Sequence, residues 1–228
     1  TTMTQAPEDA ILASWAANAA PWIALLQGSG IASRQTTNPA ITNAISRYQP
    51  DSVLDVGCGE GWLCRALAAE ESAPATVITG VDAIPALVEN AQAQHSDGTY
   101  LCSDYTQLPN ALRGQTFAVI VCNFSLFGED SVAQLLATLK LHLRADGTLL
   151  IQTLHPLMAC NGDYRSGWRT GSWAGCSDAF HDAPPWYFRT LSDWLALLQQ
   201  QGLHVYMEEP LDPQTHTPLS VIFHARQP

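Results

Sequence analysis

The stretch SVLDVGCGEGWLCRAL, residues 52–67, decides the fold of this chain. Residues 52–56 are largely apolar and rich in valine, which is typical of a buried strand, and residues 62–69 carry apolar side chains at helical spacing. The turn between them holds three glycines, Gly57, Gly59 and Gly61. Glycine adopts positive φ and leaves no Cβ in the way of a ligand, and the following helix offers free N–H groups and a partial positive charge. The sequence therefore predicts a turn that presses its backbone against a ligand.

Two classes of ligand compete for a glycine turn of this kind. The nicotinamide pattern G-x-G-x-x-G has a third glycine where helix and strand pack closely, and its helix end holds a pyrophosphate. In this chain that third position is Trp62. Asp55, two residues before the first glycine, is unfavourable beside a pyrophosphate but suits an ammonium group, and S-adenosylmethionine has an ammonium group and no phosphate. A turn without any ligand is the third alternative.

Composition bounds the class of protein. With 228 residues, of which 46% are apolar, the chain suits one α/β domain with a modest insertion. Its net charge is −11, and its 10 Lys and Arg residues form no basic stripe, so we expect no nucleic-acid partner. No apolar run is long enough to span a membrane, and the first residues lack the basic segment of a secretory signal. We therefore expect no membrane partner.

The cysteines predict a reducing compartment. They are Cys58, Cys64, Cys102, Cys122, Cys160 and Cys176, and they form neither a C-x-x-C pair nor a Cys/His cluster with zinc spacing. We therefore expect free thiols, a cytoplasmic protein and no metal site.

Strand and helix patterns alternate after residue 50. Strands are expected at 52–56, 76–81, 99–102, 117–122 and 148–153, with helices at 62–69, 85–95 and 131–143 between them. A helix capped by Thr190 or Ser192 and two strands, 203–207 and 219–224, complete the chain. Repeated β-α units imply a doubly wound, mainly parallel sheet. Ahead of it, residues 7–27 read as a helical segment interrupted at Pro21, and Asn38 as N-cap with Pro39 at the first position opens a second helix.

Two acidic residues stand where the ligand of an open parallel sheet binds, past the carboxyl ends of the strands. Asp82 ends the second strand, where a carboxylate can accept both ribose hydroxyls of a nucleoside. In the alternative, it is a helix N-cap. Asp104, followed by Tyr105, ends the third strand and can accept the amino hydrogen of adenine. In the alternative, it is a turn aspartate.

Together these motifs resemble the class I S-adenosylmethionine-dependent methyltransferases, in the subgroup that acts on small molecules. D-V-G-C-G-E-G is similar to their first motif, and G-V-D at Asp82, S-D-Y at Asp104 and the turn L-R-A-D-G-T-L-L-I extend the resemblance over most of the chain. It implies an α/β fold with a seven-stranded sheet in the order 3-2-1-4-5-7-6, with strand 7 antiparallel. It also implies S-adenosylmethionine as the cofactor, with its methionine half at Asp55, Gly57 and Gly59, its ribose at Asp82 and its adenine at Asp104. Cys58, Ala83 and Tyr105, beside these residues, complete the expected contacts.

The end of the fourth strand should face the reactive methyl group. Asn123 is a candidate contact of the cofactor, unless it only ends the strand, and Phe124 is a candidate contact of the methyl acceptor. The segment C-N-F-S-L-F differs from the N-P-P-Y and D-P-P-Y motifs of enzymes that methylate amino groups of nucleic acids or protein side chains. This difference argues against nucleic acids and protein side chains as substrates.

The N-terminal segment resembles the entry arm of the same subgroup. Trp15, Asn18 and Trp22 fall near one helix face, and the two tryptophans are candidate acceptor contacts. Arg34, one of few cations near the cofactor end, is a candidate partner of the methionine carboxylate. The alternative is core packing for the tryptophans and a surface position for the arginine.

Residues 155–189 lack clear periodicity and are rich in aromatic residues. A long loop in a compact domain is usually functional or disordered, and this one is too aromatic for disorder, so we expect a lid over the acceptor pocket. Its candidate acceptor contacts are Tyr164, Trp168, Trp186 and Tyr187, with Arg165 and Arg169 available to a carboxylate or phenolate. His155, directly after the fifth strand, is either a general base or a packed histidine.

The sequence thus predicts a single methyltransferase domain over residues 1–228. It comprises a helical arm (1–49), a cofactor-binding half (50–154), the lid segment (155–189) and a C-terminal helix with two strands (190–228). The expected reaction is in-line transfer of a methyl group from S-adenosylmethionine to a small molecule, by a monomer or homodimer. A nicotinamide-dependent oxidoreductase and a non-catalytic S-adenosylmethionine-binding module are the alternatives.

Overall fold

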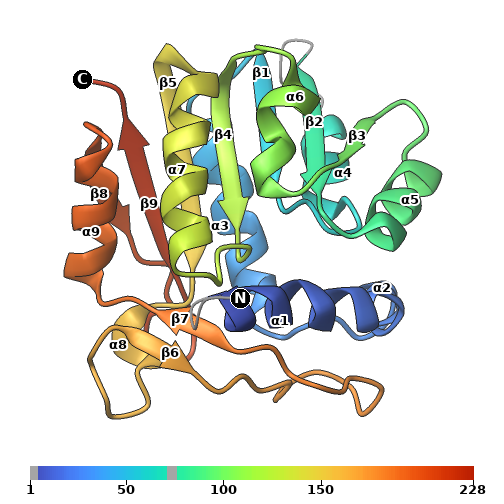
Figure 1. Ribbon diagram of the computed structural model, residues 1–228, viewed down its shortest axis with the longest axis vertical. Coiled ribbons are helices and arrows are strands. Elements are labelled where there is room, and N and C mark those ends of the chain that lie inside the picture. The colour runs from blue at the N-terminus through green and yellow to red at the C-terminus, as the bar shows by residue number, and fades with distance from the viewer. Residues whose placement is uncertain (1–4, 71–75) are drawn as a thin grey trace.

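A seven-stranded sheet forms the centre of the protein in a computed structural model that describes residues 5–70 and 76–228 (Figure 1). Predictions for residues 1–4 and 71–75 lie outside the described residues. The strands are β1 (Ser52–Val56), β2 (Val77–Asp82), β3 (Thr99–Cys102), β4 (Phe117–Asn123), β5 (Leu143–Thr153), β8 (His204–Glu208) and β9 (Val221–Arg226). Their order is β3-β2-β1-β4-β5-β9-β8, with β1 to β5 parallel and β9 antiparallel to both of its neighbours. With β8 and β9 as strands six and seven, the predicted order and the antiparallel strand are confirmed.

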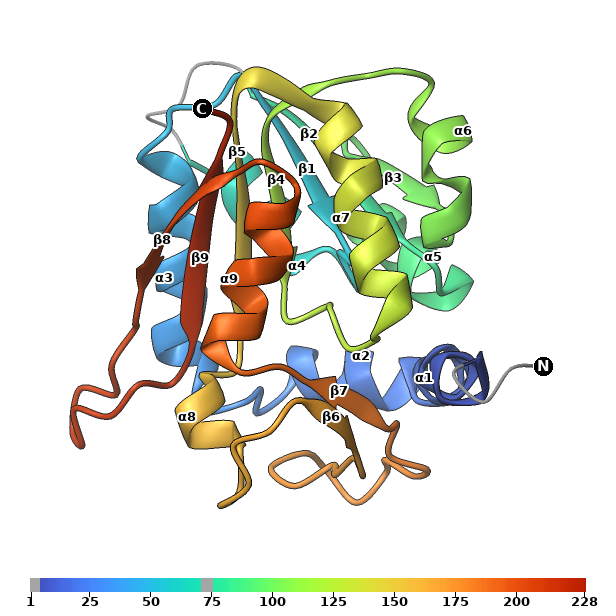
Figure 2. The ribbon, with the colours of Figure 1, turned by 60° about the vertical axis from the view of Figure 1, so that its left-hand side comes forward.

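Helices cover both faces of the sheet (Figure 2). One face carries α3 (Arg34–Ser46), α4 (Trp62–Ala68) and α5 (Pro85–Gln94), and the other carries α6 (Leu108–Leu112), α7 (Asp130–His142) and α9 (Leu191–Gln200). Side chains alternate along β4, so that Val121 packs toward α3 and α4 while Ile120 packs toward α7. Burial on both faces explains why this strand is apolar throughout.

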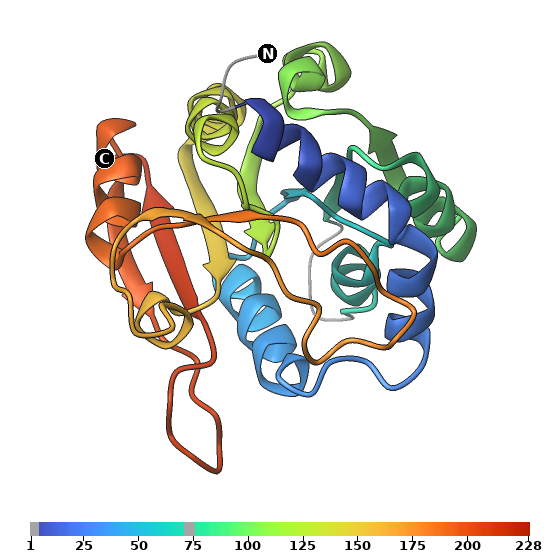
Figure 3. The same ribbon diagram turned by 60° about the horizontal axis from the view of Figure 1, so that its bottom comes forward.

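The first two helices of the predicted arm and the lid segment lie together beyond the carboxyl ends of the parallel strands (Figures 1 and 3). The arm contributes α1 (Gln5–Ala17) and α2 (Ala19–Gln27). The lid segment contributes α8 (Pro156–Ala159) and a two-stranded sheet of β6 (Gly167–Arg169) and β7 (Trp186–Phe188). Ligands of open α/β sheets bind at this edge, so both segments stand over the place where a ligand is expected.

Two predicted helix boundaries in the arm are wrong. The first helical segment breaks at Asn18 and not at Pro21, because Pro21 stands in the first turn of α2, where a missing N–H costs little. The second helix begins at Arg34, so Asn38 is not its N-cap and Pro39 lies in its interior. The N–H groups of Arg34 and Gln35 already bond to carbonyls three residues earlier, so the helix is established before it meets the proline.

Two further expectations differ from the structure. The fifth strand begins at Leu143, five residues before the predicted start, because β4 and β5 pair through a register shift: Phe117 faces Leu143 and Val119 faces Thr148. The lid segment also contains regular structure, with Trp168 opposite Tyr187 in the β6–β7 pair. Strands of three residues are too short for a periodic pattern to reveal.

No single helix among the described residues is long and apolar enough to cross a membrane. The pair Ala6–Ala17 and Ala19–Gln27 reaches the required length and composition together, with a bend of 55° between the two parts.

Candidate functional site

The glycine turn after β1 holds three left-handed glycines, with φ of 77° at Gly57, 58° at Gly59 and 88° at Gly61. A Cβ on Gly57 would collide with the side chain of Ser125, and one on Gly61 would lie 3.0 Å from Ala91. A Cβ on Gly59 would meet, among the described residues, only Trp22 Nε1 at 3.8 Å. Gly57 and Gly61 are thus required by packing, whereas a Cβ on Gly59 would make only one ordinary van der Waals contact, with Trp22.

Asp82, the last residue of β2, forms a hydrogen bond with this turn. Its Oδ2 accepts a hydrogen bond of 2.9 Å from the Gly59 N–H, and its Oδ1 accepts one of 3.0 Å from the Ile84 N–H. It is not the N-cap of α5, which is Ile84. Burial raises the pKa of Asp82, and the hydrogen bonds from main-chain N–H groups oppose that shift. Each carboxylate oxygen has a further lone pair, which is available to a hydroxyl of a ligand next to Ala83.

Asp55 and the side chain of Cys58 lie beneath the turn. Asp55 is 2% exposed, its Oδ2 accepts a weak hydrogen bond from Cys64 Sγ at 3.7 Å, and its Oδ1 has no partner among the described residues. Burial raises the pKa of Asp55 to about 7, the Cys64 bond lowers it, and the charge of Asp82 raises it further. The Cys58 thiol packs against Cys64 and Tyr100. The Cys58 main chain is therefore the part of this residue that can reach a ligand above the turn.

Asp104 and Tyr105 follow β3. Asp104 is exposed and caps the short 3-10 helix η1 (Tyr105–Gln107), with its Oδ1 accepting from the Gln107 N–H at 3.0 Å and from the Thr106 hydroxyl at 2.8 Å. The hydrogen bonds of Oδ1 are those of a turn aspartate, the alternative considered for Asp104. No described residue bonds to Oδ2, so this oxygen is available to a ligand. The Tyr105 hydroxyl donates to the Ser125 carbonyl at 3.0 Å, so Tyr105 supports the loop after β4 from below.

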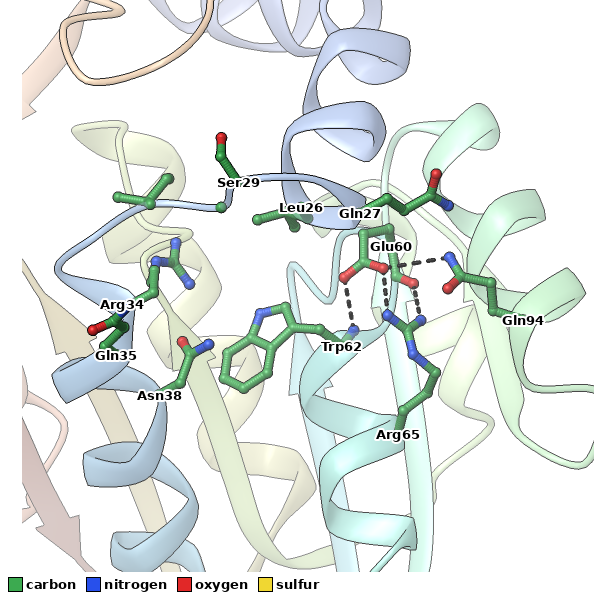
Figure 4. A pocket seen from close by; sticks show the side chains of 12 residues that line it. Leu26, Gln27, Ser29, Arg34, Gln35, Asn38, Glu60, Trp62, Arg65 and Gln94 are labelled. Atoms are coloured by element: carbon green, nitrogen blue, oxygen red, sulfur yellow. Dashed lines mark hydrogen bonds and ion pairs between the residues drawn. The ribbon is translucent and has the colours of Figure 1, made fainter.

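A cavity of about 370 Å³ opens between the glycine turn and the connection from α2 to α3 (Figure 4). Trp62, the first residue of α4, lines it, so an indole occupies the position at which a dinucleotide site has its last glycine. Glu60, also at the wall, is 2% exposed and is neutralised by an ion pair with Arg65. Asn38 lines the cavity too, and its Oδ1 is buried without a hydrogen-bond partner among the described residues.

Arg34 reaches this cavity from the first turn of α3. Its guanidinium lies over the ring of Phe124, 4.6 Å from the centroid, and 5.9 Å from the Trp22 centroid. Burial lowers the pKa of Arg34 to about 10, and the nearby Cys176 thiol raises it. No described carboxylate forms an ion pair with it, and a partly buried cation without an anion is costly. Phe124, beneath it, has a left-handed φ of 50°, a strain typical of functional positions.

Asn123, at the end of β4, belongs to a buried hydrogen-bond network. Gln152 Nε2 donates to the Thr37 carbonyl at 3.1 Å and to Asn123 Oδ1 at 2.7 Å, and Gln152 Oε1 accepts from the Ser220 hydroxyl at 2.8 Å. Because the Thr37 carbonyl can only accept, the atom of Gln152 next to it is the nitrogen, and Asn123 must present its oxygen to that nitrogen. Asn123 therefore keeps its NH₂ group, which forms no hydrogen bond to a described residue, as a free donor.

An aromatic cluster joins the arm, the loop after β4 and the lid segment. It consists of Trp15, Trp22, Phe127, Trp173 and Phe180. Trp15 is at its centre, with ring centroids 5.3 Å from Trp22, 6.1 Å from Phe127 and 5.4 Å from Trp173. Phe180 closes it, 4.8 Å from Trp173. Trp15 and Trp22 were predicted as site residues, Phe127 was placed only as part of the segment after the fourth strand, and Phe180 was not predicted. The position of Phe127 near the end of the fourth strand was the signal available for it.

The four aromatic residues predicted as acceptor contacts in the lid segment pack elsewhere, around β6 and β7. Trp168 lies 5.5 Å from Tyr187, Trp186 lies 5.8 Å from Phe188, and Tyr164 lies 6.0 Å from Phe188. The two arginines of this region are also engaged inside it. Arg165 pairs with Asp163 at 2.7 Å, and Arg169 donates to the carbonyls of Cys160, Asp163 and Arg165. These contacts hold the lid segment in shape.

His155 is 1% exposed, and both of its ring nitrogens are engaged. Its Nδ1 accepts from the Leu157 N–H at 3.3 Å, so His155 caps α8. Its Nε2 therefore carries the proton and donates to Glu209 Oε2 at 2.9 Å. This geometry favours a packed histidine over a general base.

Comparison with known proteins connects this geometry to one family. Residues 53–147 match the family model described as "Methyltransferase domain". The malonyl-[acyl-carrier protein] O-methyltransferase of Halalkalibacterium halodurans is 30% identical over 118 residues, which are 49% of this chain and 42% of that enzyme. The chain thus spans less than half the length of this curated relative.

Two solved structures share the fold over most of the chain. An S-adenosylmethionine dependent methyltransferase from Mesorhizobium loti superposes with a TM-score of 0.60 at 24% identity, covering 81% of this chain and 96% of that one. The Burkholderia thailandensis 1,6-didemethyltoxoflavin-N1-methyltransferase, solved with bound 1,6-didemethyltoxoflavin and S-adenosylhomocysteine, has a TM-score of 0.68 at 14% identity and covers 99% of this chain and 91% of that one. At these identities the likeness establishes the fold.

Proposed function

Because residues 53–147 belong to the methyltransferase domain family, we propose that this chain binds S-adenosylmethionine and transfers its methyl group to a small molecule. The observation that carries the proposal is the arrangement around Gly59. A Cβ there would meet only Trp22, at 3.8 Å, and the N–H of the residue is bonded to Asp82. The Trp22 ring also lies 5.9 Å from the guanidinium of Arg34, which forms no ion pair with a described carboxylate. A ligand with hydroxyl groups at one end and a carboxylate at the other fits these partners.

The residues present fit S-adenosylmethionine group by group. Arg34 is the partner of the methionine carboxylate, and the main chain from Gly57 to Gly59 holds the methionine half. Asp82, beside Ala83, accepts the ribose hydroxyls. The exposed Asp104, beside Tyr105, accepts the adenine amino group. Asp55 supports the turn from below instead of contacting the cofactor, which changes its expected role.

When bound, S-adenosylmethionine supplies a methyl group on a positively charged sulfur, which makes the sulfur a good leaving group. The chain contributes position, because holding the acceptor atom in line with the methyl group supplies most of the rate. Asn123 offers an N–H donor at this edge, and the aromatic cluster excludes water. With both nitrogens of His155 engaged, we assign the removal of an acceptor proton to solvent.

The acceptor is proposed to be a flat or apolar small molecule. Trp15, Phe127 and Trp173 give rigid apolar area at the edge where the methyl group arrives. Arg165 and Arg169 are not expected to pair with the acceptor, because both already bond to groups within the lid segment. The relative named for malonyl-[acyl-carrier protein] and the structural neighbour that binds 1,6-didemethyltoxoflavin show that the fold accepts different substrates.

Calorimetry with S-adenosylhomocysteine and with NADH tests the cofactor. We expect micromolar or tighter binding of S-adenosylhomocysteine and none of NADH. Arg34→Gln should weaken the binding of S-adenosylhomocysteine by about 1.5–3 kcal/mol, the range for a hydrogen bond to a charged group. Arg113→Gln, a change of an exposed arginine in a turn, is the matched control. Binding of NADH alone would support the oxidoreductase instead, and binding without any turnover on a broad metabolite pool would support the non-catalytic module.

We further propose a cytoplasmic location. All six cysteines are free thiols, and free thiols persist in reducing compartments. Cell fractionation with an antibody against the chain tests this, and recovery in a membrane or secreted fraction would contradict it.

A further inference from the structure

Glu8, in the first turn of α1, caps a helix other than its own. Its Oε1 accepts hydrogen bonds from the main-chain N–H groups of Glu129, at 2.9 Å, and Ser131, at 3.4 Å, and its Oε2 accepts from the Ser131 hydroxyl at 2.6 Å. These groups form the N-terminus of α7, whose N-cap residue Glu129 makes no side-chain cap of its own. Glu8 therefore supplies, from far away in the sequence, the acceptor and the negative charge that this helix end requires.

The loop that Glu8 holds, residues 127–129, is also the anchor of the lid segment. The Tyr187 N–H donates to the Phe127 carbonyl at 2.7 Å. Arg189 donates to the carbonyls of Gly128, at 2.9 Å, and Glu129, at 2.8 Å. The loop is thus bonded to the arm through its N–H side and to the lid segment through three successive carbonyls.

The other end of α1 is bonded to the lid segment directly. Asn18, which is fully buried, donates to the His181 carbonyl at 2.8 Å and accepts from the His181 N–H at 3.0 Å. The Ser14 hydroxyl donates to the Asp182 carbonyl at 2.6 Å. Between the two ends, Trp15 packs on Phe127 from the loop and on Trp173 from the lid segment. Helix α1 is therefore fixed at one end by Glu8 and at the other by Asn18.

We propose that Glu8 is a positioning residue for the acceptor half of the site. By capping α7 it holds Phe127 in contact with Trp15. It also orients the carbonyls to which the lid segment is bonded. The arm and the lid segment therefore close as one unit. This inference rests on the proposed function for its meaning in catalysis. Its structural content, that a carboxylate on α1 controls the lid segment, stands on the hydrogen bonds alone.

The test compares Glu8→Ala with Glu8→Gln, which retains an oxygen that can accept from the Glu129 N–H. The control Asp97→Ala removes one exposed negative charge in the turn between α5 and β3. Three quantities are measured: amide hydrogen exchange at Glu129 and Ser131, the rate of tryptic cleavage at Arg165 and Arg169, and the Kd for S-adenosylhomocysteine.

For Glu8→Ala we expect exchange and cleavage to rise at least about tenfold, the change that corresponds to 1.4 kcal/mol, with the Kd for S-adenosylhomocysteine within about twofold of the wild type. Glu8→Gln should recover most of the protection, and Asp97→Ala should match the wild type. Wild-type cleavage in Glu8→Ala would overturn the inference, as would an equal rise in Asp97→Ala. If the wild type itself fails to bind S-adenosylhomocysteine, the proposed function fails, while the exchange and cleavage comparison still decides the role of Glu8.

Gly128 provides a second, independent variant. A Cβ at this position would collide with the Ser131 hydroxyl and with the Glu8 carboxylate, so Gly128→Ala should expel Glu8 from the helix end. We expect this variant to open the lid segment as Glu8→Ala does, and the double variant to show no further increase, since both changes break the same contact. Fully additive increases in cleavage would overturn the inference. Thermal melts of each variant identify any that fails to fold, and in that case Glu8→Gln and the exchange measurement decide.

Discussion

The main-chain N–H of Gly59 donates a hydrogen bond of 2.9 Å to the carboxylate of Asp82, which follows it by 23 residues. The bond is possible because β1 and β2 are parallel neighbours, so that the turn after β1 and the last residue of β2 meet at one edge of the sheet. One carboxylate thus both shapes the glycine turn and offers lone pairs to a ligand. This double role links the shape of the turn to ligand affinity.

Asp82→Ala should weaken the binding of S-adenosylhomocysteine by roughly 1.5–3 kcal/mol, because two ribose hydroxyls lose a charged acceptor. Isothermal calorimetry measures the change, and a thermal melt without cofactor shows how much of it comes from the loosened turn. An unchanged affinity in a folded variant would remove Asp82 from the site.

Gly59→Ala should abolish cofactor binding while the fold survives. The added Cβ meets only Trp22, at 3.8 Å, so it would compete with the cofactor more than with the protein. The alanine must also adopt a left-handed φ of 58°, which costs about 1–2 kcal/mol in a non-glycine residue. Gly114→Ala is the matched control, because its φ is 74° and its Cβ would meet nothing within 4 Å. In denaturant titrations the two variants should lose similar amounts of unfolding free energy, and only Gly59→Ala should lose the ability to bind S-adenosylhomocysteine. Equal binding by both would show that Gly59 does not face the cofactor.

Asp55→Asn should make the protein more stable at alkaline pH than the wild type. Burial raises the pKa of Asp55 from about 3.9 in the unfolded chain to about 7. The folded state therefore disfavours the charged form, and this penalty is absent below about pH 4, grows as the pH rises, and is complete above about pH 7. Its size is on the order of 4 kcal/mol. Denaturant titrations of both proteins between pH 4 and 8 should give a difference in unfolding free energy that widens with pH. Parallel curves would mean that Asp55 ionises as freely in the folded state as in the unfolded chain.

Replacement of residues 170–185 by an Asn-Gly turn should leave cofactor affinity within about tenfold, roughly 1.4 kcal/mol, and abolish methyl transfer to the acceptor. Arg169 and Trp186 face each other in the β6–β7 pair, so a two-residue turn can join them and keep this hairpin. The deletion removes Trp173 and Phe180 from the aromatic cluster and His181 from its bonds with Asn18. Calorimetry and a turnover assay on a metabolite pool measure the two effects. Full activity would move the acceptor pocket away from the lid segment, to the arm between Trp15 and Arg34.

The sequence alone determined the alternation of strands and helices, the glycine turn and the acidic residues at the strand ends, whereas the order of the strands was implied by the resemblance to a known family. The local features follow from short-range patterns: apolar runs predict buried strands, glycines predict a turn, and right-handed crossovers between parallel strands restrict the topology. Each needs only a window of a few residues together with a general rule. For the same reason the position of Arg34 near the cofactor end could be expected, although its lack of a counter-ion among the described residues could not.

Only the tertiary structure decided what each side chain contacts. It showed that Gly59, and not Gly57 or Gly61, has room for a Cβ, because Ser125 and Ala91 pack against the other two. It placed Asp55 beneath the turn, where the Cys64 thiol is its neighbour. The helix break at Asn18 and the cap of α7 by Glu8 depend on hydrogen bonds between residues 163 and 121 positions apart. Such contacts have no local signal, because the free energy of a buried polar group depends on partners that only the folded chain brings to it.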